Sequence, residues 1–122
     1  MIQLKRAYEP RDPKDGHRVL IDRLWPRGIK KQELAFDEWL KDLAPRAEIR
    51  KDFGHDPTRW RSFVSAYKKE LRSPQARKLI EKLARQAVEQ TLTLLYGSRD
   101  EKHNNAVVLK DVLEKEFGKL KR

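Results

Sequence analysis

Two apolar runs in the sequence predict buried β-strands. Residues 19–21 (VLI) form a continuous, mostly β-branched run, and residues 91–96 (TLTLLY) form the second clear internal strand. Continuous apolar runs of this length are typical of strands covered on both faces, as in a parallel sheet. Residues 2–8 alternate apolar and polar side chains at their start, which predicts a half-buried strand. Since Pro26 has no backbone N–H for a strand ladder, we expect the strand at residues 19–21 to end near Trp25.

Most of the remaining chain has helical spacing of its apolar residues. One-sided apolar patterns cover residues 36–43, 60–71, 79–88 and 106–117, and the segment AEIRKDF is expected to add one or two short turns. Pro45 should end the first of these helices. An Asp or Ser followed by proline, at Asp56 and Ser73, is typical of a helix start, and Gly118 is typical of a helix end.

This order of elements predicts an α/β fold. Two buried strands joined through helices should pair in parallel with a right-handed crossover. We therefore expect a small, mostly parallel sheet with a helix-rich middle, arranged as a two-layer or three-layer sandwich. A chain of 122 residues is long enough for one hydrophobic core, so the prediction is a single domain over residues 1–122.

The charge balance favours anionic partners. The chain has 29 Lys and Arg against 19 Asp and Glu, a formal net charge of +10. The basic residues are spread along the sequence, which is typical of a solvated surface. Nucleic-acid binding by the basic faces of the middle helices is the alternative interpretation, with Lys68, Lys69, Arg72, Arg77, Lys78, Lys82 and Arg85 as its candidate residues.

Composition also excludes several classes of site. The chain has no cysteine, so it forms no disulfide, no thiolate metal site and no cysteine nucleophile. It has neither an apolar run long enough to span a membrane nor an N-terminal signal peptide, and we expect a cytoplasmic protein with no membrane partner. The three histidines lack zinc-site spacing and no glycine-rich phosphate loop is present, so the sequence leaves any cofactor unknown. The oligomeric state is equally unknown.

Polar and aromatic residues gather where the two internal strands end, and there we place the candidate site. In parallel sheets, ligands bind outside the carboxyl ends of the strands, and two neighbouring strands would bring both loops to one crevice. The expected ligand-binding residues are Arg23, Trp25, Arg27, Tyr96, Arg99 and Asn104, and the candidates for proton transfer are Asp100, Glu101 and His103. Guanidinium groups bind phosphate or carboxylate through two hydrogen bonds, and an aromatic ring offers a stacking surface. Histidine titrates near neutral pH, and a carboxylate beside it can fix its tautomer.

Each of these residues also has a structural interpretation. Arg23 and Arg27 would tie the two loops together if they paired with nearby carboxylates. Trp25 would belong to the core, and either Asn104 or Asn105 would cap the last helix. The acidic residues ahead of that helix would stabilise its positive end without taking part in a reaction.

Five motifs resemble one known family. RVLIDRLWPRGIKK, DEWLKDLAP, FGHDPTRW, TLLYGSRDEKHN and AVVLKDVL occur in the order seen in the YeaO-like family of uncharacterised proteins, domain of unknown function 488. The resemblance implies a small α/β domain and supplies no reaction. It places the family's LWPRG block on residues 24–28 and its RDE-x-HN block on residues 99–104, in the same two loops. Arg46 is a departure, because relatives are expected to carry a helix-capping serine there.

The sequence thus supports three hypotheses of function. The first is an enzyme or sensor that binds a small anionic, phosphorylated or nucleotide-like molecule at the carboxyl ends of the strands, with Glu101 and His103 transferring protons. The second is a nucleic-acid-binding protein. The third is a non-catalytic interaction protein in which both loops act only as internal clamps.

Overall fold

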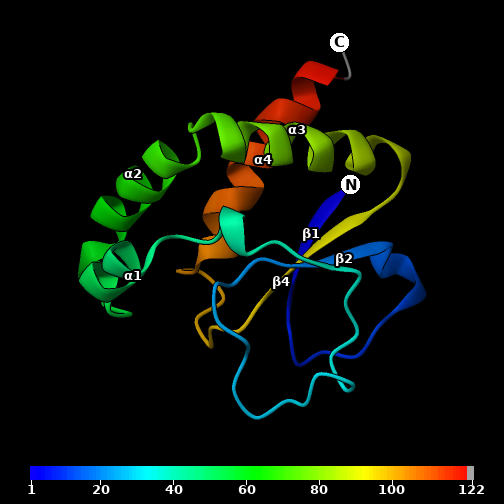
Figure 1. The fold of residues 1–122 in the computed structure, drawn as a ribbon, viewed down its shortest axis with the longest axis horizontal. Coiled ribbons are helices and arrows are strands. Elements are labelled where there is room, and N and C mark those ends of the chain that lie inside the picture. The colour runs from blue at the N-terminus through cyan, green and yellow to red at the C-terminus, as the bar shows by residue number, and fades with distance from the viewer. Residues whose placement is uncertain (121–122) are drawn as a thin grey trace.

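The computed structural model describes residues 1–120 and shows a small α/β fold (Figure 1). Its strands are β1 (Ile2–Arg6), β2 (His17–Leu20), β3 (Glu38–Trp39) and β4 (Leu92–Tyr96). Its α-helices are α1 (Ala47–Phe53), α2 (Trp60–Glu70), α3 (Pro74–Glu89) and α4 (Asn105–Leu120), with short 3-10 turns at Pro13–Asp15, Lys41–Leu43 and Pro57–Arg59. None of the helices in this range is long and apolar enough to cross a membrane.

The four strands form one parallel sheet in the order β1-β4-β2-β3. The fully buried strand β4 is central, and Leu94 is in register with Leu4 on one side and Val19 on the other. The predicted α/β class, the parallel pairing and the neighbouring positions of β2 and β4 are confirmed. Strand β2 ends at Leu20, earlier than the expected end near Trp25.

Different segments cover the two faces of the sheet. Helices α2, α3 and α4 pack on one face around Val19, Leu92 and Leu94. On the opposite face the long connection between β2 and β3, blue to cyan in Figure 1, covers Leu20 and Leu95. The second core is completed by Ala7, Trp25, Ile29, Leu34, Phe36 and Trp39. One layer of helices and one layer of irregular chain therefore enclose the sheet.

The helix predicted over residues 36–43 is wrong. The backbone there pairs with the edge of β2 instead: the Asp37 N–H donates to the Arg18 carbonyl at 2.8 Å and the Leu40 N–H to the Leu20 carbonyl at 2.9 Å. The indole N–H of Trp39 adds a hydrogen bond of 2.7 Å to the carbonyl of Asp22. An open strand edge thus satisfied backbone groups that a short helix would have left unpaired at its ends.

The other predicted helices form, with one different boundary. Asp56 accepts the N–H of Thr58, and the Ser73 hydroxyl accepts the N–H of Ala76, as expected for helix starts. Gly118 does not end the last helix, which continues to Leu120. Helix α1 begins after Arg46, which provides no side-chain cap and pairs with Glu70.

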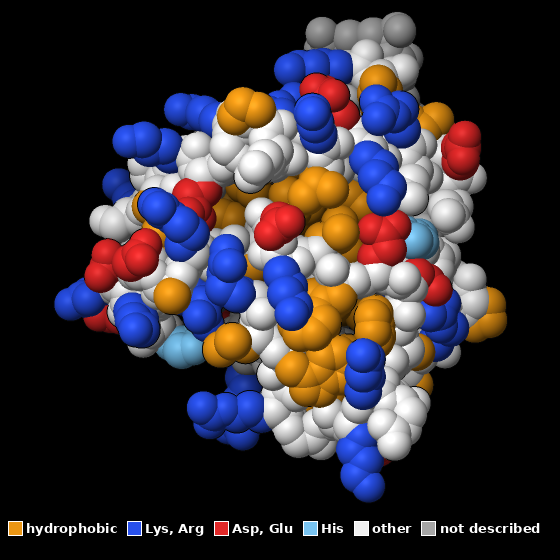
Figure 2. Space-filling view, viewed as in Figure 1, with side chains coloured by type: hydrophobic (Ala, Val, Ile, Leu, Met, Phe, Trp, Pro, Cys, Tyr) orange, Lys and Arg blue, Asp and Glu red, His pale blue; other side chains and the backbone are white. Residues whose placement is uncertain are grey.

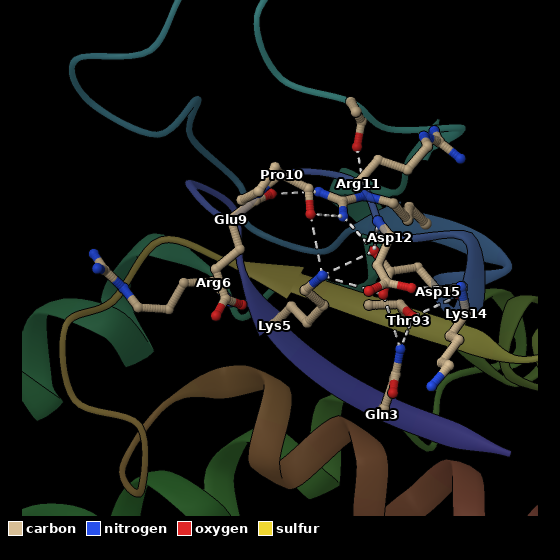
Figure 3. Close-up of polar contacts among 12 residues, drawn as sticks. Gln3, Lys5, Arg6, Glu9, Pro10, Arg11, Asp12, Lys14, Asp15 and Thr93 are labelled. Atoms are coloured by element: carbon tan, nitrogen blue, oxygen red, sulfur yellow. Dashed lines mark hydrogen bonds and ion pairs between the residues drawn. The ribbon is translucent and has the colours of Figure 1, made fainter.

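A buried polar network fixes residues 9–16 on the irregular face of the sheet. Figure 3 shows Gln3 and Lys5 reaching from β1 toward Asp15, whose carboxylate lies 3.0 Å from the Lys5 ammonium. Arg18, 0% exposed, donates a hydrogen bond of 2.6 Å to the same carboxylate. Burial alone would raise the pKa of Asp15, but hydrogen bonds from the Asp12 N–H, Lys5 and Arg18 outweigh it and lower the pKa to about 2.

Candidate ligand-binding cleft

The loops that follow β2 and β4 meet at the carboxyl edge of the sheet and line one cleft of about 1200 Å³. Helix α1 and the start of α2 supply its third side. The lining residues are Arg6, Tyr8, Asp22, Arg23, Leu24, Trp25, Pro26, Arg27, Pro45, Arg50, Lys51, Phe53, His55, Phe63, Gly97, Ser98, Arg99, Asp100, His103, Asn104 and Asn105. Both predicted loops therefore face the same hollow.

Asp22 holds the two loops together at the base of this cleft. Its Oδ2 accepts the Gly97 N–H at 2.8 Å, and its Oδ1 accepts the side-chain amide of Asn105 at 3.1 Å. A Cβ on Gly97 would lie 3.0 Å from that Oδ2, so glycine allows the close approach of the loops. Burial raises the pKa of Asp22, and the hydrogen bonds from Asn105 and Gly97 and the charge of Arg50 offset only part of this effect.

Three guanidinium groups on the cleft carry donors that the protein does not use. Arg27 and Arg99 are exposed, and their side chains make no hydrogen bond or ion pair with residues 1–120. Arg50 reaches the cleft from α1, and its Nε is buried without a hydrogen-bond partner in the described chain. The cleft is therefore a region of positive potential with free hydrogen-bond donors.

Arg23 has a structural role that the sequence left open. Its Nε lies 3.3 Å from the Pro45 carbonyl, and its Nη2 lies 3.2 Å from the Ala44 carbonyl. These bonds fix the loop after β2 to the segment that precedes α1. Arg23 pairs with carbonyls and not with the carboxylates considered above, and its charge still faces the cleft.

The two aromatic candidates differ in position. Trp25 lines the cleft, but its indole N–H donates to the Ile29 carbonyl at 2.7 Å and its ring packs edge-on against Phe36 and Trp39. Tyr96 is 4% exposed, belongs to the core on the helical face and is not part of the cleft lining. Trp25 is therefore the one of the two that lines the cleft.

Asp100 and His103 form a hydrogen-bonded pair on the cleft wall. The Asp100 carboxylate accepts the backbone N–H groups of Lys102 and His103, each at 2.9 Å, and lies 3.0 Å from Nδ1 of His103. The two backbone hydrogen bonds are the main reason that the pKa of Asp100 is lowered. The His103 ring also packs edge-on against Trp60, with ring centres 5.2 Å apart. When Nδ1 carries the proton shared with Asp100, Nε2 is left with a lone pair.

Of the two remaining predicted site residues, Asn104 caps helix α4 and Glu101 lies on the surface. Asn104 lines the cleft, but its Oδ1 accepts the Val107 N–H at 3.0 Å, so it caps α4 as the structural interpretation expected. Glu101 is exposed and is not part of the cleft lining. Within residues 1–120, no group of three His, Asp or Glu side chains is placed to hold a metal ion.

The basic residues of the middle helices are partly neutralised. Lys68 pairs with Asp111 at 2.7 Å, Arg77 with Glu116 at 2.7 Å, and Lys82 with Glu38 at 3.6 Å. Figure 2 shows basic side chains scattered over the visible face with acidic ones among them. The positive charge there does not form an uninterrupted strip.

Comparison with known proteins identifies the family. Residues 1–121 match a family model described as "Inactive DUF488-N3 subclade". The chain belongs to the DUF488 family. This DUF488 protein is 46% identical to the uncharacterized protein YeaO of Escherichia coli over 112 residues, 92% of this chain and 96% of the relative. It is 38% identical to the uncharacterized protein Rv3073c of Mycobacterium tuberculosis over 92% of both chains. No solved structure matches it significantly. The family resemblance of the five sequence motifs is thereby confirmed.

Sequence reasoning missed the contribution of α1 to this DUF488 cleft. Arg50 lies between the two predicted loops in sequence, on a helix of seven residues. The segment was expected to be helical, but nothing in its pattern indicates that it borders the strand ends. A basic residue following an apolar one, as Arg50 follows Ile49, is the only local signal, and it occurs elsewhere in the chain.

Proposed function

We propose that the cleft binds a small anionic molecule, phosphorylated or nucleotide-like, through Arg27, Arg50 and Arg99. The observation that carries this proposal is that these three guanidinium groups line one cleft with donors left unused. Like charges gathered at one place repel each other, and a bound anion replaces repulsion with charge-assisted hydrogen bonds. Arg23 adds its charge while its hydrogen bonds hold the loop, and the Trp25 ring offers a surface for an attached ring.

Binding without turnover is the form of this function that we favour. The matching subclade is described as inactive. The Asp100 carboxylate already organises its own loop, and Glu101 lies outside the cleft lining. Proton transfer by Asp100, Glu101 and His103 stays a prediction. A ligand sensor or carrier needs only the arginines.

Nucleic-acid binding stays the alternative, and the ion pairs of Lys68, Arg77 and Lys82 weaken it. Phosphate binding by lysine and arginine depends steeply on salt because bound counterions are released. Titration of duplex DNA and of single-stranded RNA at two salt concentrations tests this alternative. No measurable binding at low salt would eliminate it.

Titration calorimetry of Arg27→Ala and Arg99→Ala with inorganic phosphate tests the proposed function. A charge-assisted hydrogen bond is worth about 1.5–3 kcal/mol, so each variant should bind phosphate at least about tenfold more weakly. Arg61→Ala is the matched control. Arg61 is exposed on α2 outside the cleft, and its replacement by alanine removes the same single positive charge. All three variants should unfold at the temperature of the unaltered protein.

Equal weakening in the Arg61 variant would contradict the proposal, since it would indicate a general charge effect. Unaltered phosphate binding in the Arg27 and Arg99 variants would also contradict it. Loss of folding in those two variants would support internal clamping as the role of the arginines.

A further inference from the structure

Asp22 keeps unused acceptor capacity on the cleft. A carboxylate has about four lone-pair sites, two on each oxygen. The Gly97 N–H occupies one site on Oδ2, and the Asn105 amide occupies one site on Oδ1. No ion pair with Asp22 forms within residues 1–120, although its side chain lines the cleft. One acceptor site therefore remains on each oxygen of a poorly solvated carboxylate, which is costly until a donor arrives.

Arg50, in the same cleft, has a hydrogen-bond donor that lacks an acceptor within residues 1–120. Its charge acts on Asp22, but the two side chains form neither a hydrogen bond nor an ion pair. The buried Nε of Arg50 has no partner in the described chain. A group inserted between them would have to accept hydrogen bonds from Arg50 and donate hydrogen bonds to Asp22.

We infer that the ligand is a phosphate ester that also carries free hydroxyl groups, as a sugar phosphate or a nucleotide does, with its phosphate on Arg50 and its hydroxyls on Asp22. This inference rests on the proposed function and adds the class of ligand. Two hydroxyls on neighbouring carbons match one free acceptor site on each carboxylate oxygen. In dinucleotide-binding folds, an acidic side chain accepts a hydrogen bond from a ribose hydroxyl.

The charge around the cleft favours hydroxyl donors over an ammonium group. Arg23, Arg27, Arg50 and Arg99 all line it, so a cationic group on the ligand would be repelled as it approached Asp22. A neutral hydroxyl donates the same hydrogen bonds without that repulsion. An ester without alcohol hydroxyls, such as methyl phosphate, satisfies the arginines and brings no alcohol hydroxyl to the remaining acceptor sites of Asp22.

Ribose 5-phosphate and methyl phosphate separate the two contributions in the unaltered protein. Both carry the phosphate ester, and only the first carries hydroxyls. We expect ribose 5-phosphate to bind at least about tenfold more tightly in titration calorimetry, the effect of one charge-assisted hydrogen bond. Asp22→Asn should reduce this ratio to near one, whatever change it makes to the affinity for methyl phosphate itself. Asp42→Asn, at an exposed position outside the cleft, is the matched control and should keep the ratio.

The outcomes distinguish this inference from the proposed function. Equal affinity of both esters for the unaltered protein would overturn the inference and leave anion binding intact. Tighter binding of phosphoethanolamine than of ribose 5-phosphate would also overturn it, because that ester carries an ammonium group. Failure of all these esters and of inorganic phosphate to bind would overturn the proposed function itself. Because the ester comparison uses the unaltered protein, it is valid even if Asp22→Asn unfolds.

Discussion

Replacement of the buried Arg18 by methionine should cost a large part of the stability of the fold. The guanidinium donates to the Asp15 carboxylate at 2.6 Å and to the carbonyls of Ala35, Glu9 and Pro10 at 2.7, 3.0 and 3.3 Å. Methionine fills much of the same volume and provides none of these donors. The substitution therefore isolates the polar contribution from the packing contribution.

The magnitude follows from what is left unpaired. Removal of one member of a buried ion pair costs about 3–5 kcal/mol. Lys5 still pairs with Asp15, which limits the loss, while buried carbonyls without donors add to it. We therefore expect the free energy of unfolding to fall by about 3–4 kcal/mol, against a total of about 5–15 kcal/mol for a domain of this kind.

Urea unfolding followed by circular dichroism measures this loss directly. With a slope of about 1–3 kcal/mol per molar urea, the midpoint should fall by more than about 1 M. Arg61→Met, at an exposed position without a side-chain partner in the described chain, is the matched control and should change the midpoint little. A loss below about 1 kcal/mol in Arg18→Met would refute the reasoning, because it would mean that water replaces the guanidinium at little cost.

Two further predictions concern Asp15 and Gly16, in the segment over residues 9–16 that packs around Arg18. The pKa of Asp15 is about 2 in the folded protein against 3.8 for an ordinary aspartate, so its ionised form contributes about 2 kcal/mol above pH 5 that is lost as the pH falls toward 2. Urea unfolding from pH 2 to 6 should show this loss, and Asp15→Asn should show a smaller pH dependence; equal slopes would contradict the assignment. Gly16→Ala should destabilise by about 3 kcal/mol or more, because a Cβ would lie 2.2 Å from the Thr91 carbonyl oxygen at a φ of +62°. Gly28→Ala, at a φ of +79° with open space around it, should cost only about 1–2 kcal/mol when both glycine variants are unfolded in urea, and equal losses would refute the steric argument.

The two internal strands of the sheet could be predicted because β4 is fully buried and β2 is buried over Arg18–Leu20. The apolar residues of 19–21 and 91–96 do not have helical spacing, so neither segment could be mistaken for a helix. The helices that connect the two strands required parallel pairing. The meeting of the two loops followed from that pairing alone. No side-chain detail was needed, because parallel neighbours end at the same edge.

The segment around β3 could not be predicted from periodicity. Phe36 and Trp39 have helical spacing, but both rings pack against Trp25 over the irregular face of the sheet. Apolar side chains that cover a neighbouring aromatic residue in an extended segment can have helical spacing by coincidence. The open edge of β2, which decides the outcome, is a tertiary feature.

The buried polar groups were missed for a related reason. Arg18 directly precedes an apolar run, and a basic residue there is usually read as exposed. It is buried because the loop over residues 9–16 folds back and supplies Asp15 and carbonyl acceptors. The contribution of Arg50 to the cleft depends in the same way on a third segment whose position is set by tertiary packing.

Some cleft residues form hydrogen bonds within the protein and others do not, and the two groups should respond differently to substitution. Asp22 and Arg23 form hydrogen bonds that hold neighbouring segments in place, so their removal should change both stability and ligand binding. The side chains of Arg27 and Arg99 form no hydrogen bond or ion pair within the described chain. Their replacement by alanine would reduce repulsion among the positive charges of the cleft and should leave the fold as stable or slightly more stable. The unpaired arginines that line the cleft thus repel one another, and a bound anion would relieve this repulsion. This repulsion distinguishes a binding cleft from an internal clamp. In an internal clamp, the same arginines would already be paired with carboxylates of the protein.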